Sequence, residues 1–244
     1  KVLYAEDAAA ACRHVLAIAR EKGAKLAVKS KSMATEEIGL AKAMEQEGIR
    51  AVETDLGEYI VQIAGEMPSH ITAPAIHKSR EQIGRLFQEK LGVPYTPDPE
   101  ELTAIARKTL RQEFLKADLG ITGANFLIAE TGTLVIIENE GNIGLTTTVP
   151  KTHIAVVGIE KIIPRLADLP LEVSQHLLAC AALCLDLILK PLAGVGQGLR
   201  HSVVGLLFLR RLQVVEVVGG RGSAELAILG GWGFPRKWRS LADF

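Results

Sequence analysis

The chain has 244 residues, of which 48% are hydrophobic and 23% are charged, as expected for a globular protein with a sizeable core. Its 28 basic and 28 acidic residues cancel, so the composition shows no electrostatic footprint for a nucleic-acid partner. The three cysteines suggest no disulfide framework, and the longest apolar run, around residues 177–185, is shorter than the roughly 18 residues that span a bilayer. We therefore expect a cytoplasmic protein without a membrane span.

Hydrophobic periodicity predicts alternating helices and strands up to about residue 165. The expected helices cover residues 6–22, 35–46, 56–63, 78–91 and 100–116, and the expected strands cover residues 24–29, 49–54, 70–73, 125–130, 133–137 and 152–158. Thr35 and Asp55 are expected to cap two of the helices, and Glu58 is expected on the surface. The alternation predicts an α/β fold with a mostly parallel sheet covered by helices and an antiparallel insertion at residues 120–138.

Within that insertion, two short apolar strands flank the sequence Glu130-Thr131-Gly132. The connection is short enough for a hairpin turn, in which Gly132 is free to take a positive φ. The second strand ends in the polar, turn-forming residues 138–142, so the hairpin is expected to present polar groups at an edge.

Two further polar junctions follow expected strands, at Lys29–Ser32 and at His77–Arg80. Ligands of open α/β sheets bind beyond the carboxyl ends of the strands. We therefore expect these two junctions and residues 138–142 to lie near a common edge or cleft. Lysine, histidine and arginine side chains there would suit a small anion.

Five stretches, in order and at sensible spacing over roughly residues 20–165, resemble the LUD domain, the lactate-utilization family. They are VKSKSM (28–33), ETDLGEYIVQ (53–62), PSHITAPAIHKSR (68–80), IGRLF (83–87) and ADLGITGANFLIAETGTLVIIENEGNIGLTTTVP (117–150). The resemblance implies the fold shared by CoA transferases and ribose-phosphate isomerases. It also implies a subunit of an L-lactate oxidation complex, in which electrons pass from lactate to iron–sulfur centres.

The same resemblance implies other lactate-utilization subunits as partners and a small carboxylate such as lactate as ligand. The family carries its 4Fe–4S clusters in a cysteine-rich C-terminal domain that this sequence lacks. Cys180 and Cys184 stand four residues apart, but a four-iron cluster needs four ligands. We expect no cofactor and no metal to be bound by this segment.

The candidate site residues are carboxylates, amides, hydroxyls and cations near the strand ends. The expected catalytic residues are Glu130 and Glu140. The expected ligand-binding residues are Lys29, Ser30, Lys31, Ser32, His77, Arg80, Asn125, Thr131, Asn139 and Asn142. In the CoA-transferase fold a glutamate in a glycine-containing turn is a covalent nucleophile, and Glu130 is topologically similar. A carboxylate-dependent CoA or acyl transferase, an isomerase, and a scaffold without catalysis therefore stand as alternatives.

The domain is expected to cover residues 1–170, with an N-terminal segment missing because the chain opens directly into a helical pattern. Residues 171–244 differ in character, since acids become rare and leucine, glycine and valine dominate. A helix over 172–189 and strands near 203–209, 212–218 and 224–229 are expected there. A frame change in the gene and a divergent tail are both consistent with this composition.

Overall fold

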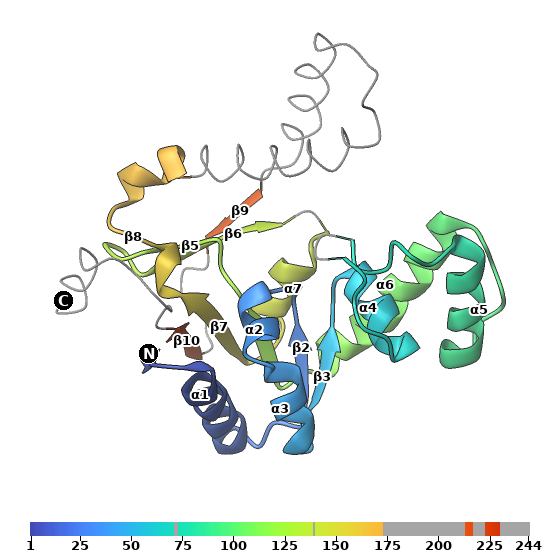
Figure 1. Cartoon of the computed structure of the whole chain (residues 1–244), viewed down its shortest axis with the longest axis horizontal. Coiled ribbons are helices and arrows are strands. Elements are labelled where there is room, and N and C mark those ends of the chain that lie inside the picture. The colour runs from blue at the N-terminus through green and yellow to red at the C-terminus, as the bar shows by residue number, and fades with distance from the viewer. Residues whose placement is uncertain (71–72, 139, 173–212, 217–222, 230–244) are drawn as a thin grey trace, which may run out of the picture. The chain divides into compact units, whose positions relative to one another are not determined.

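The computed structural model describes residues 1–70, 73–138, 140–172, 213–216 and 223–229 (Figure 1). These residues form two compact units. The first contains residues 1–124 and 140–160 together with the strand at 223–229. The second contains residues 125–138 and 161–172 together with the strand at 213–216.

The first unit is built on a sheet whose strands all run parallel, in the order β1-β10-β7-β4-β2-β3. Their bounds are Val2–Ala5 (β1), Ser223–Leu229 (β10), Thr152–Gly158 (β7), Leu119–Thr122 (β4), Leu26–Lys29 (β2) and Arg50–Glu53 (β3). The predicted parallel sheet is confirmed. Because every pairing is parallel, the carboxyl ends of these strands lie along one edge.

Helices pack against this sheet (Figure 1). They bury two separate apolar cores, and alternate strand residues contribute to each core. Ala27 and Ala51 pack in the core formed with α1 (Ala8–Glu21) and α3 (Leu40–Gln46). Val28 and Val52, each one residue further on, pack with α4, α5 and α6. These three helices span Leu56–Ala64, Arg80–Leu91 and Pro99–Lys116. Alternation of this kind is the normal consequence of strand geometry.

A short helix, α7 (Asn142–Thr148), lies against β4. A Cβ atom at Gly120 would clash with the backbone carbonyl of Thr146, so this close packing requires glycine in the strand. The sequence pattern placed residue 142 at the end of a polar turn and predicted no helix over residues 142–148. The helix is therefore an addition that the sequence pattern did not indicate.

The single helix expected over 35–46 is wrong, because two helices occupy this stretch. α2 spans Met33–Glu37, and Gly39, with φ of 66°, interrupts the path before α3 begins. The expected N-cap is also wrong. Ser32 caps α2 by accepting from the Thr35 N–H at 3.4 Å, and the Thr35 hydroxyl donates to the Ser32 carbonyl at 2.8 Å.

Two other expectations need correction. Glu58, expected on the surface, is 8% exposed because it pairs with a lysine from another loop. The strand expected over 70–73 is absent at His70 and Ala73, while residues 71–72 lie outside the described part. In its place, Pro74 and the turns after it lead to α5, which starts at Arg80, two residues later than expected. Ser79 and Gln82 form a capping box there.

The second unit is the predicted hairpin with two short additional strands. β5 (Phe126–Ile128) pairs antiparallel with β6 (Thr133–Glu138), which confirms the expected turn around Gly132. β8 (Ile162–Ile163) pairs with β5, and β9 (Gln213–Glu216) pairs with β6. Apolar side chains of β5, β6 and β8 form its core, together with Leu169. The antiparallel insertion is thus confirmed for the hairpin strands, whereas residues 120–122, which the prediction included, belong to β4 of the parallel sheet.

Strands expected near 212–218 and 224–229 are present as β9 and β10. The strand expected over 203–209, and the expected helix from residue 173 on, lie outside the described residues. The boundary at residue 170 and the origin of the tail stay predictions. Within the described ranges, no helix is both long enough and apolar enough to cross a membrane.

Replacing Gly120 by alanine should destabilise the first unit by about 1–3 kcal/mol, because the added methyl group meets the Thr146 carbonyl and overpacks the contact with α7. Urea unfolding followed by circular dichroism measures the loss. Leu145→Ala is the control, since Leu145 lies on the same helix but is 44% exposed. Equal stability of the two variants would contradict the close approach.

Candidate functional site

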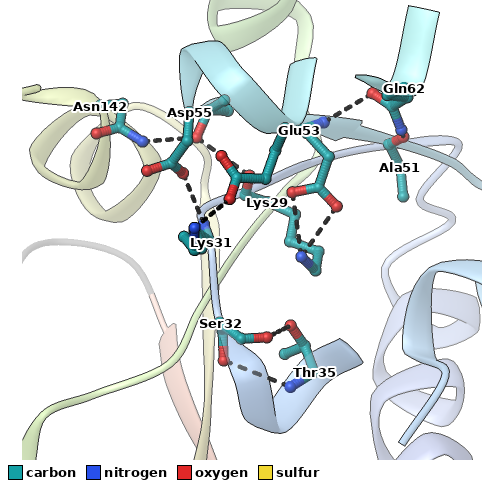
Figure 2. Close-up of polar contacts among 11 residues, drawn as sticks. Lys29, Lys31, Ser32, Thr35, Ala51, Glu53, Asp55, Gln62 and Asn142 are labelled. Carbon is teal, nitrogen blue, oxygen red and sulfur yellow. Dashed lines mark hydrogen bonds and ion pairs between the residues drawn. The ribbon is translucent and has the colours of Figure 1, made fainter. Parts of the chain in front are cut away.

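The carboxyl ends of β2 and β3 carry a buried ion pair. The Lys29 side chain is 1% exposed, and its ammonium group donates to both carboxylate oxygens of Glu53, at 2.9 and 3.1 Å (Figure 2). Gln62 fixes the same strand end, since its amide oxygen accepts from the Glu53 N–H at 3.0 Å and its amide nitrogen donates to the Ala51 carbonyl at 2.8 Å. α4 is thereby attached to β3.

The loop after β2 is bound to the start of α4 by two further contacts. The Lys31 ammonium pairs with Glu58 at 2.6 Å, and the Lys31 N–H donates to the Asp55 carboxylate at 2.6 Å. Asp55 occupies the N-cap position of α4, as predicted, but its side chain makes no capping bond to that helix. Glu140 accepts from the Leu56 N–H instead, at 3.1 Å.

Asn142 joins the same network from the start of α7. Its amide donates to the Thr54 hydroxyl at 3.1 Å, and it also hydrogen bonds to Asp55. Residues 140–142 therefore lie beside the ends of β2 and β3, so two of the three segments expected at a common edge meet. Glu138 belongs to the second unit and Asn139 lies outside the described residues.

His77–Arg80 makes its described polar contacts within residues 66–82. His77 contacts Ser69 and Glu66, each at 2.8 Å, and Lys78 pairs with Glu66 at 2.7 Å. Arg80 pairs with its neighbour Glu81. These contacts give no support for placing the segment with the other two.

Each cation that the sequence assigned to an anion site has a carboxylate partner. Lys29, Lys31, His77 and Arg80 contact Glu53, Glu58, Glu66 and Glu81 respectively. Around Asp55, two lysines face four carboxylates, those of Glu53, Asp55, Glu58 and Glu140. With all of these groups ionised, the cluster carries a formal charge of −2, which disfavours a free anion there.

Within this cluster, Asp55 is protonated more easily than an ordinary aspartate. Burial raises its pKa to about 6, and the nearby carboxylates of Glu140 and Glu58 add to the rise. Hydrogen bonds from the Lys31 backbone and the Asn142 amide act in the opposite direction. Burial also raises the pKa of Glu53, although Lys29 opposes that change.

The sequence reasoning missed two buried polar side chains of the same sheet, Thr122 on β4 and His153 on β7. The His153 Nε2 and the Thr122 hydroxyl are 2.8 Å apart, and both residues are buried on neighbouring strands. Burial lowers the pKa of His153 to about 4, so its imidazole is neutral at pH 7. The available signal was a polar residue near the end of an otherwise apolar, fully buried strand.

The candidate residues of the second unit have mainly structural contacts. Asn125 holds the hairpin, since its N–H donates to the Val135 carbonyl at 2.9 Å and its side chain accepts from the Ile137 N–H at 2.8 Å. Glu130 is exposed and accepts from the Leu166 N–H at 3.1 Å. The hydroxyls of Thr131 and Thr133 are 2.7 Å apart. Catalytic roles for Glu130 and Glu140 stay predictions.

The sequence profile of the LUD domain matches residues 1–184. The chain belongs to the LUD domain family. Among the described residues, this LUD domain has no group of three or more histidine, cysteine, aspartate or glutamate side chains arranged to hold a metal ion.

Curated relatives contain the same LUD segment within a longer protein. Lactate utilization protein B of Macrococcus caseolyticus is 50% identical over 175 residues, which are 71% of this chain and 37% of that protein. The uncharacterized electron transport protein YkgF of Escherichia coli is 47% identical over 174 residues, which are 71% of this chain and 37% of that protein. Lactate utilization protein B of Oceanobacillus iheyensis is 45% identical over 204 residues, which are 84% of this chain and 42% of that protein. This LUD chain thus spans about two fifths of their length.

A solved structure of a DUF162 family protein from Deinococcus radiodurans also resembles the LUD chain. The similarity covers 93% of this chain and all of that one, with a TM-score of 0.33 and 14% sequence identity.

Replacing Lys29 by methionine should lower the free energy of unfolding of this LUD domain by about 3–5 kcal/mol, because it leaves the Glu53 carboxylate buried without its cation. The double variant Lys29→Met, Glu53→Leu should recover most of the loss, since it removes both charges. Arg20→Ala breaks an exposed pair with Glu47 and is the control, with a far smaller expected effect. A double variant as unstable as the single one would contradict a buried pair.

Asp55 should make the domain less stable as pH rises from about 4 to above 6. Its folded-state pKa is raised, so between these values the folded state binds more protons than the unfolded state, and stability falls with increasing pH. Asp55→Asn should flatten this part of the profile, while Glu53 continues to titrate in both proteins. Thermal unfolding from pH about 4 to about 7 provides the measurement, and parallel profiles for the two proteins would rule out the raised pKa.

Proposed function

We propose that this chain is the LUD portion of a lactate utilization protein and takes part in the oxidation of L-lactate by an iron–sulfur complex. The observation that carries the proposal is the 50% identity over 175 residues with a protein named lactate utilization protein B. The name of the Escherichia coli relative, an electron transport protein, supports the same direction. The activity of such a complex belongs to the whole assembly rather than to this domain by itself.

In this proposal the redox centres lie outside the chain. A 4Fe–4S cluster is held by four cysteine thiolates, and the chain has three cysteines, one of which, Cys12, lies on α1 and is buried. The relatives extend well beyond the matched segment, and other lactate-utilization subunits are the expected partners. The LUD portion then binds a small ligand or organises these partners, in the cytoplasm.

The network at the ends of β2 and β3 is the part of the domain best suited to that task. It brings loops from three separate parts of the sequence together and contains a carboxylate, Asp55, whose pKa of about 6 allows it to hold or release a proton near physiological pH. Oxidation of a 2-hydroxy acid to a keto acid releases protons as well as electrons. A proton-holding group near the ligand is therefore consistent with this chemistry.

The direct test is a chimera of lactate utilization protein B in which the matched 175-residue segment is replaced by the corresponding segment of this chain. We expect it to restore growth on L-lactate to a bacterium that lost this growth when its own protein was deleted. An immunoblot and growth on pyruvate control for expression and general fitness. A chimera carrying the Leu115→Ala change, at a residue 63% exposed, should behave like the unmodified one.

The biochemical counterpart is lactate-dependent reduction of a dye by the purified chimera mixed with its partner subunits. We expect reduction only when all subunits are present, because the clusters and the LUD portion are on different parts of the assembly. A well-expressed chimera that supports neither growth on lactate nor dye reduction would refute the proposal.

A further inference from the structure

Three buried hydroxyl residues, Thr54, Ser30 and Thr122, form a row across the carboxyl ends of β3, β2 and β4. Lys29 pairs in register with Glu53 on one side and with Ile121 on the other. The three hydroxyl residues are those that directly follow Glu53, Lys29 and Ile121 in the sequence. The ladder continues through them, since the Thr54 N–H donates to the Lys29 carbonyl at 2.9 Å and the Ser30 N–H donates to the Ile121 carbonyl at 3.0 Å. Residues in one row share a face and lie about 4.8 Å apart.

One member of this hydroxyl row, Ser30, has a hydroxyl group whose hydrogen-bonding capacity is unused, and His153 on the neighbouring strand β7 has an unused ring nitrogen. The Ser30 hydroxyl and the His153 Nδ1 are buried and have no partner among the residues that the structure describes. Ser30 is 1% exposed and His153 is 5% exposed. Native proteins leave few buried polar groups unpaired, so the unpaired Ser30 hydroxyl at the strand ends indicates a missing hydrogen-bonding group.

The hydroxyl row lies directly behind a partly exposed rim. Each of its members is followed by a partly exposed residue, Asp55, Lys31 and Gly123 respectively. Gly123 keeps the rim narrow, because a Cβ atom there would lie 2.6 Å from the Ser32 hydroxyl. A small molecule that reaches the rim from solvent is therefore one residue away from the Ser30 hydroxyl.

We propose that the hydroxyl row and its rim bind a small 2-hydroxy acid, with the ligand hydroxyl bonded to Ser30 and the carboxyl group at the rim beside Lys31. The class of ligand rests on the proposed function. The position of the binding site rests on the unpaired Ser30 hydroxyl and on the register of β2, β3 and β4. His153 supports the row from β7, because its Nε2 lies 2.8 Å from the Thr122 hydroxyl.

The charges at the rim decide when an anion can bind. Lys31 follows β2, Asp55 and Glu58 come from the start of α4, and Glu140 precedes α7. The Lys29–Glu53 pair lies on the strands, with Glu36 of α2 acting on Glu53. The net charge of these groups is negative at neutral pH. Protonation of Asp55 makes this net charge less negative. Binding of a hydroxy-acid anion should therefore strengthen as the pH falls through about 6, while binding of an uncharged analogue should not change.

The experiment titrates the full chain with L-lactate, L-lactamide and propionamide, following the histidine ring nitrogens and the backbone amides of residues 30, 54 and 122 by NMR. Lactamide removes the ligand charge, and propionamide also removes the hydroxyl. We expect lactamide to bind at least about tenfold more tightly than propionamide, because a polar site discriminates against a ligand that leaves its groups unpaired. Lactate should bind several-fold more tightly at pH about 5 than at pH about 8, with lactamide unchanged.

Ser30→Ala provides the matched variant. It removes a hydroxyl that has no partner among the described residues, so the fold should be unaffected, while the preference for lactamide over propionamide should disappear. Ser69→Ala removes a hydroxyl bonded to His77, away from the row, and should leave all affinities unchanged. The His153 ring nitrogens should shift on addition of lactamide in the wild-type chain and not in Ser30→Ala.

Equal binding of lactamide and propionamide, or an unchanged affinity in Ser30→Ala, would overturn the proposal. Magnetization transfer from water to the Ser30 region that persists after each ligand is added would also overturn the proposal. It would show that an ordered water molecule, and no ligand, is the partner of Ser30. The chimera test separates this site from the proposed function. Growth on lactate with a chimera that carries Ser30→Ala would leave the function standing and remove the site.

Discussion

The buried pair of Lys29 and Glu53 is the constraint on which the carboxyl edge of the main sheet depends. Two ionised groups leave water at this place, on adjacent parallel strands in register, and each is tolerated only because the other is there. The pair fixes the ends of β2 and β3 relative to each other. The loops that follow these strands then start from defined positions, and the polar network of the candidate site is built on those loops.

An exchange of helix-capping roles connects this edge to distant parts of the chain. Asp55 stands where it could cap its own helix, yet its carboxylate binds the backbone of the loop after β2. Glu140, from another segment, accepts from the N–H of Leu56, the first residue of that helix. A local interaction has been replaced by two long-range ones, at the expense of gathering several carboxylates in one place. Burial is the main reason that the pKa of Asp55 is raised, and the gathered carboxylates add to the rise.

Much of the fold could be predicted because it depends on local patterns. The hairpin around Gly132 follows from two β-branched runs with a short turn, and α1 follows from its apolar stripe. The division between α2 and α3 was missed because apolar periodicity continues across Gly39, whereas the backbone changes direction there. The burial of Glu58 could not be inferred from its own helix, because its partner Lys31 comes from a different loop.

The site itself was only half predictable for a related reason. Polar residues after strands indicated Lys29–Ser32 and Asn142, and those residues do meet. Sequence cannot show which cations are already paired, so the assignment of His77 and Arg80 to the same anion site found no support in their contacts. Thr122 and His153 were hidden inside apolar runs, where a single polar residue resembles an ordinary interruption of the pattern.

The contacts of Glu140 and Asn142 also have a kinetic consequence. They close loops of 84 and 88 residues, because their partners are Leu56 and Thr54. Contacts of such sequence separation form only after much of the intervening chain has been ordered, since loop closure costs entropy before any contact compensates for it. The sheet core is therefore expected to assemble before the polar edge is complete. The edge is also the part that can open while the core stays folded, which is a common property of regions that admit ligands.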